Sequence, residues 1–112
     1  MDRTTPVYSY TAAEKRARRT LFIRGFRQAT ADCLDPAVTR RIEEIDRSAA
    51  ERGARELRAL HDLLATARQD AATAKAKEKA APRAERDAAR QARKDAEQRV
   101  RLAERALARA ER

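Results

Sequence analysis

The feature that most constrains this chain is a long run, from Pro36 to Ala80, in which nothing obliges a helix to end. The run has no proline after its first residue and one glycine, Gly53, and its apolar residues recur every three or four positions. That spacing places side chains on one face of a helix. Because a lone helix would leave this stripe in water, it must pack against another helix of the chain or of a second copy. The stripe consists of Val38, Ile42, Ile45, Ala49, Gly53, Leu57, Leu60, Leu64, Ala67, Ala71 and Ala74.

The composition favours an all-α, elongated fold. Charged residues make up 40% of the 112 residues and aromatic residues only 4%, and much of the 42% hydrophobic fraction is alanine. Alanine buries little area per side chain, so a thick layered core cannot form. A mixture of this kind with helical periodicity is typical of long helices and coiled coils. We therefore expect antiparallel helical hairpins, or a coiled coil, built on one long central helix.

Capping signals divide the chain. The segment from Thr11 to Glu14 matches a capping box, which predicts a first helix from about Thr11 to Cys33. Asp35 is a good N-cap and Pro36 fits the first helical position, so the long helix begins there. The predicted segments are an extended arm (1–10), a basic-then-apolar amphipathic helix (11–34), a long central coiled-coil helix (35–81) and an Ala/Arg-rich C-terminal helix (82–112).

The first helix is expected to pack through an apolar face made by Phe22, Phe26, Ala29 and Cys33, with Ile23 and Leu34 at its edge. The connection to the central helix is short, so the two helices should be antiparallel neighbours. Folding the chain about residue 35 places Phe26 near Ile45 and Phe22 beside Ala49.

Pro82 has two interpretations, because it removes an amide and disfavours helical geometry at Ala81. The helix either kinks there and continues, or the chain turns back. The absence of a glycine favours the kink, whereas the apolar pattern favours reversal. A reversal would bring Val100, Ala103 and Leu107 beside Leu64, Leu60 and Leu57. The first and last helices would then cover opposite ends of the central one.

The net charge of +9 is unevenly placed along the chain. Residues 1–34 carry +4, residues 35–81 carry +1 and residues 82–112 carry +4. An excess of this kind suits either a solvated helical surface or an anionic partner such as nucleic acid. The absence of an apolar run of about 18 residues argues against a membrane span. The single cysteine, Cys33, fits a reducing compartment, so a cytoplasmic location is expected.

No catalytic or metal signature emerges, so we expect neither an enzyme nor a cofactor. His61 is the only histidine, and the two glycines, Gly25 and Gly53, both fall inside predicted helices rather than in a phosphate-binding loop. The carboxylates alternate with arginines, which makes solvated ion pairs rather than the desolvated acids that general acid–base chemistry needs.

Two kinds of function compete. The first is a self-associating coiled-coil protein that binds DNA or RNA nonspecifically through its basic ends, as an accessory or architectural factor. Tyr8 and Tyr10 precede the basic segment and could stack on bases. The second is a structural or adaptor protein, such as a helical spacer or assembly factor in a phage particle or other complex. The candidate nucleic-acid-binding residues are Lys15, Arg16, Arg18, Arg19, Arg24 and Arg27. The candidate residues for binding a protein partner or a second copy are Phe22, Phe26, Leu57, Leu60 and Leu64.

Overall fold

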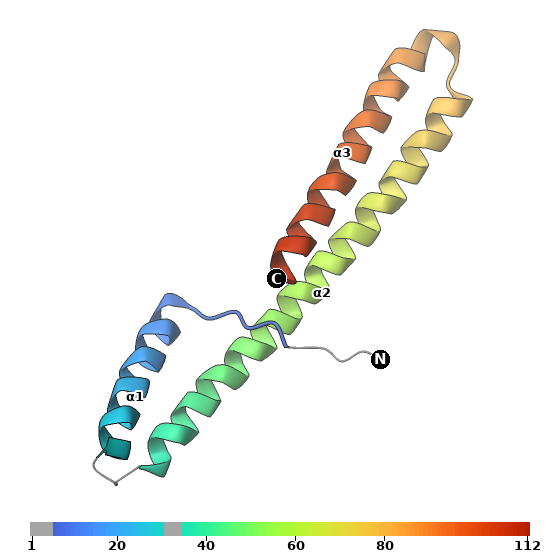
Figure 1. The fold of residues 1–112 in the computed structure, drawn as a ribbon. Coiled ribbons are helices and arrows are strands. Elements are labelled where there is room, and N and C mark those ends of the chain that lie inside the picture. The colour runs from blue at the N-terminus through green and yellow to red at the C-terminus, as the bar shows by residue number, and fades with distance from the viewer. Residues whose placement is uncertain (1–5, 31–34) are drawn as a thin grey trace. The chain divides into compact units, whose positions relative to one another are not determined.

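The computed structural model describes residues 6–30 and 35–112, and within them the chain is all-α. The elements are α1 (Ala12–Thr30), α2 (Pro36–Ala80), a short 3₁₀ helix η1 (Arg83–Glu85) and α3 (Arg86–Ala110) (Figure 1). The predicted fold class, helical hairpins built on one long central helix, is confirmed. The chain divides into two compact units within α2, Met1–Arg55 and Glu56–Arg112, and each is described by itself.

Both predicted helix starts are made by the expected side chains. The amide of Glu14 donates to Oγ1 of Thr11 (3.1 Å), and the amide of Thr11 donates to Oε1 of Glu14 (2.9 Å). At the start of α2 the amide of Ala37 donates to Oδ1 of Asp35 (2.9 Å). These side chains satisfy amides that the first helical turn leaves without partners. The predicted end of the first helix, at Cys33, lies outside the described residues.

The stripe predicted along the central helix is buried or half-buried at every one of its positions. In the first unit, Leu21 of α1 packs with Val38 and Ile45 of α2. Tyr10, Ala17 and Ile42 surround this small core.

The prediction that α1 packs through Phe22 and Phe26 is wrong. The exposed fractions of Phe22 and Phe26 are 49% and 75%, whereas Leu21 is buried against α2. Adjacent helical residues differ by about 100° in direction, so burying Leu21 turns Phe22 outward. Ile23, predicted at the edge of the packed face, is 49% exposed. The side chains of Ala29, Cys33 and Leu34 lie outside the described residues.

The described part of the extended arm, residues 6–10, runs against α2. The amide of Ser9 donates to the carbonyl oxygen of Ala49 (3.0 Å). A Cβ at Gly53 would overlap the carbonyl group of Val7, coming within 2.7 Å of its carbon. Gly53 therefore has a structural role, because only a residue without a side chain lets the arm's backbone come this close.

In the second unit the chain reverses at Pro82. Pro82 is extended (φ −62°, ψ 158°), and its carbonyl oxygen accepts from the amide of Glu85 (2.9 Å) as η1 begins. The α3 helix then returns along α2, as Figure 1 shows. Of the two interpretations of Pro82, the structure therefore takes the reversal. The six residues expected to meet do form one cluster: Leu57, Leu60, Leu64, Val100, Ala103 and Leu107.

Candidate nucleic-acid interface

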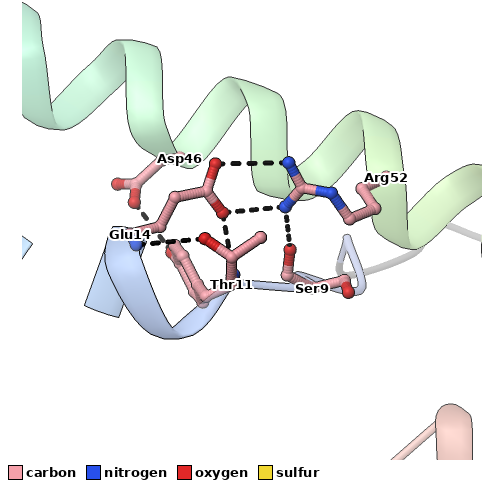
Figure 2. Close-up of polar contacts among 6 residues, drawn as sticks. Ser9, Thr11, Glu14, Asp46 and Arg52 are labelled. Carbon is pink, nitrogen blue, oxygen red and sulfur yellow. Dashed lines mark hydrogen bonds and ion pairs between the residues drawn. The ribbon is translucent and has the colours of Figure 1, made fainter. Parts of the chain in front are cut away.

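The first turn of α1 is held on α2 by one guanidinium. Nη1 of Arg52 donates to Oε1 of Glu14 (2.8 Å) and to the carbonyl oxygen of Ser9, and Nη2 lies 3.3 Å from Oε2 of Glu14. Figure 2 shows the Glu14 carboxylate between its own capping contact with Thr11 and this guanidinium. The hydrogen bonds from Arg52, and next the bond from the Thr11 amide, hold the pKa of Glu14 below its ordinary value.

A second polar cluster forms around Asp46 on α2. Its Oδ1 accepts from the hydroxyl of Tyr10 (2.7 Å) and from Nε of Arg18 (2.7 Å). The hydrogen bond from Arg18 holds the pKa of Asp46 below its ordinary value, and Asp46 in turn raises the pKa of Arg18. Burial, followed by the hydrogen bond to Asp46, raises the pKa of Tyr10. All these shifts favour the protonation states present at neutral pH.

Arg18 also lies over two aromatic rings. Its guanidinium carbon is 4.5 Å from the ring centroid of Phe22 and 5.4 Å from that of Tyr10. The rings of Tyr8 and Tyr10 stack at 5.8 Å with an interplanar angle of 10°. Tyr10 therefore contributes to the packing and hydrogen bonding of the first unit, while Tyr8 is 47% exposed. Together these contacts fix the surface of α1 next to the arm.

The predicted basic residues separate into two groups. Arg18 is half-buried and paired with Asp46, so its charge is largely neutralised within the first unit. The other basic residues of α1 are exposed, and within residues 6–30 and 35–112 none of them has an ion-pair partner. These five exposed residues, called the α1 basic surface from here on, are Lys15, Arg16, Arg19, Arg24 and Arg27.

Apolar and cationic side chains mix on the outer face of α1. A shallow hollow is lined by Tyr10, Lys15, Arg18, Arg19, Phe22 and Ile23. Residues 15, 19, 22, 23 and 26 recur at intervals of three and four, so they share one helical face. This face differs from the buried one, which carries Leu21.

The leucines predicted to bind a partner lie elsewhere. Leu64 is 6% exposed, and Leu57 and Leu60 are half-buried around it, so all three pack against α3 of the same chain. This part of the apolar stripe on α2 is therefore covered by α3.

The apolar periodicity of α2 does not indicate two residues of the site, Asp46 and Arg52. Each sits at the edge of the apolar stripe of α2, next to Ile45 and Gly53 respectively. Charged residues at that edge, opposite a basic helix that contains Glu14, are the pattern that could have indicated them.

Comparisons with known protein families, with characterised proteins and with solved structures found no match. Within the part of the chain that the structure describes, no helix is both long enough and apolar enough to cross a membrane. The same residues contain no group of three or more His, Cys, Asp or Glu side chains placed to hold a metal ion.

Proposed function

We propose that this protein is a non-enzymatic helical protein that self-associates and binds nucleic acid nonspecifically, as an accessory or architectural factor. The observation that carries the proposal is the α1 basic surface. Five cationic side chains are exposed on 19 residues of helix, without ion-pair partners among the described residues. Such a surface can neutralise phosphates and release their counterions, which gives affinity without sequence specificity.

The aromatic residues on the same face favour single strands over duplexes. Phe22 is 49% exposed, and the guanidinium of Arg18 lies over its ring. On the arm, Tyr8 is 47% exposed and stacks on Tyr10. Unpaired bases can stack on exposed aromatic rings, whereas the bases of a duplex are already stacked. Cationic groups beside an aromatic ring are the combination that single-stranded nucleic acid recognises.

A titration against salt tests the proposal. Binding of a fluorescent single-stranded oligonucleotide, followed by anisotropy, should be measurable at low ionic strength and should weaken linearly on logarithmic axes as salt rises. A duplex of the same length should bind more weakly. No binding at low salt, or binding that salt leaves unchanged, would refute a phosphate-directed interface.

The second candidate is an adaptor that binds a protein, and it too has a specific observation behind it. Phe22, Ile23 and Phe26 form an exposed apolar row with exposed fractions of 49%, 49% and 75%. Exposed apolar clusters of this kind often mark protein-binding surfaces. An adaptor should lose its partner when Phe22 and Ile23 are replaced by serine, yet keep it in high salt. Nucleic acid binding should instead be lost in high salt.

A further inference from the structure

We propose that one face of the α2–α3 hairpin, the face that carries Leu63 and Leu102, packs against the same face of a second copy of this chain. The inference rests on the self-association in the proposed function and names the surface responsible. That surface belongs entirely to the second unit, whereas the α1 basic surface belongs to the first.

The two flanks of this hairpin differ in chemistry. One flank is spanned by charged pairs: Nη2 of Arg68 lies 3.4 Å from Oε2 of Glu104, and Nε2 of His61 lies 3.8 Å from Oε2 of Glu111. The other flank exposes Leu63 and Leu102, at 55% and 51%. Within residues 56–112 the exposed large apolar side chains therefore lie on one flank only, and a contiguous exposed apolar patch is typical of an interaction surface.

The shape of the apolar flank suits packing against a second copy. Leu63 and Ala67 from α2 line a groove with Leu102, Ala103 and Ala106 from α3. Leu63 and Ala67 are four residues apart, as are Leu102 and Ala106, so each pair lies along one side of its helix and the groove runs along the hairpin. The leucines protrude and the alanines leave hollows, so the leucines of one copy can fill the hollows of another. A surface that carries both knobs and holes suits a two-fold interface.

The charges at the groove favour a second copy over a partner whose charges all have the same sign. Asp70 borders the groove on α2 and Arg99 borders it on α3. Further along the same side, Lys77 lies beside small residues such as Ala89 and Ala92. A polyanion or a strongly acidic peptide would meet Asp70, whereas a copy related by a two-fold axis brings both signs and can match each with its opposite.

Sedimentation equilibrium on the full chain tests this surface with two matched double variants. Leu63→Glu with Leu102→Glu adds two charges to the apolar flank, at positions already about half exposed. Ala65→Glu with Ala108→Glu adds the same charges at exposed alanines outside the groove. We expect the wild type and the alanine-site variant to dimerise alike, and the leucine-site variant to dimerise at least about a hundredfold more weakly.

Circular dichroism shows whether the leucine-site variant keeps its helices. If its helix content falls, Leu63→Ala with Leu102→Ala replaces it, because alanine preserves helix propensity while removing the knobs. A wild type that stays monomeric would overturn self-association altogether. A dimer that both leucine-site variants leave intact would overturn this face while leaving self-association in place. Oligonucleotide binding, measured separately, reports on the α1 basic surface alone.

Discussion

The guanidinium of Arg52 and the carboxylate of Glu14 form a two-point ion pair, Nη1 to Oε1 at 2.8 Å and Nη2 to Oε2 at 3.3 Å. The same carboxylate accepts the amide of Thr11, and the same guanidinium donates to the carbonyl oxygen of Ser9. One pair of side chains therefore completes a helix cap and ties the arm and α1 to α2. This connection holds α1 with Arg18 toward Asp46 and Arg19 toward solvent.

The first unit should lose stability in acid. Glu14 and Asp46 have pKa values below their ordinary 4.5 and 3.8, because Arg52 and Arg18 hydrogen-bond their ionised forms. The stability from each carboxylate is present above its ordinary pKa and is lost as the pH falls through the lowered one. Thermal unfolding followed by tyrosine fluorescence should show the loss. Asp46→Asn should make the midpoint less sensitive to acid, and unchanged sensitivity would contradict this role.

The same unit should also weaken in strong alkali. The pKa of Tyr10 is raised above its ordinary 10.0, first by burial and then by its hydrogen bond to Asp46. A raised pKa contributes stability that is complete below pH 10 and is lost as the pH rises through the folded value. Absorbance titration should show a tyrosine, Tyr10, that ionises above its ordinary 10.0. In Tyr10→Phe that late ionisation should be absent, and its persistence would contradict the assignment to Tyr10.

The two glycines should respond oppositely to alanine. A Cβ at Gly25 would lie 3.6 Å from Cγ1 of Val38, an ordinary contact, whereas one at Gly53 would overlap the carbonyl group of Val7. Gly25→Ala should therefore stabilise the first unit by up to about 1 kcal/mol through helix propensity. Gly53→Ala should destabilise it by displacing the arm, with loss of protection at the Ser9 amide in hydrogen exchange. Equal effects of the two changes would contradict the docked arm.

Arg18 and Arg19 are neighbours with different roles. Arg18→Gln should destabilise the first unit by about 1 kcal/mol, a figure reduced because the ion pair with Asp46 is about a third exposed. Arg19→Gln should change stability by no more than about 0.5 kcal/mol, since its side chain is exposed. It should instead reduce the slope of oligonucleotide affinity against salt by about one. Chemical denaturation and salt titration of both variants measure the two effects.

Two adjacent leucines in the second unit give a similar contrast. Leu64 is 6% exposed in the hairpin core and Leu63 is 55% exposed. Leu64→Ala should cost about 2–4 kcal/mol of hairpin stability, because it opens a cavity against α3. Leu63→Ala should cost far less at protein concentrations where the chain is monomeric. Far-UV circular dichroism melts compare them, and a Leu63 variant as unstable as the Leu64 variant would show that Leu63 belongs to the core.

The parts of the fold that local rules govern could be predicted from the sequence. The capping box at Thr11, the N-cap at Asp35 and the stripe on α2 each depend on residues close together in the chain. The apolar pattern favours the reversal at Pro82, because that arrangement pairs Leu64 with the apolar residues of α3 in the same chain. Each of these features follows from capping chemistry or from helical periodicity.

The packed face of α1 could not be predicted in that way. Leu21 and Phe22 are adjacent and both apolar, so periodicity admits either as the buried one. The structure favours Leu21 through the Arg18–Asp46 and Glu14–Arg52 pairs, which join residues 28 and 38 positions apart. Contacts of this range have no local signature. Burial of Leu21 also changes the candidate site, because in this orientation of α1 Arg18 pairs with Asp46 and Arg19 is exposed.

The most direct test of the nucleic-acid interface compares two charge reversals in the same unit. Lys15→Glu with Arg19→Glu changes the α1 basic surface, and Arg40→Glu with Arg47→Glu makes an equal change at exposed positions of α2. Both variants alter the net charge equally, so only the location differs. Anisotropy titrations with a single-stranded oligonucleotide across a salt series should show binding abolished in the first variant and only modestly weakened in the second. Equal losses in the two variants, or tight binding by the first, would contradict an interface on α1.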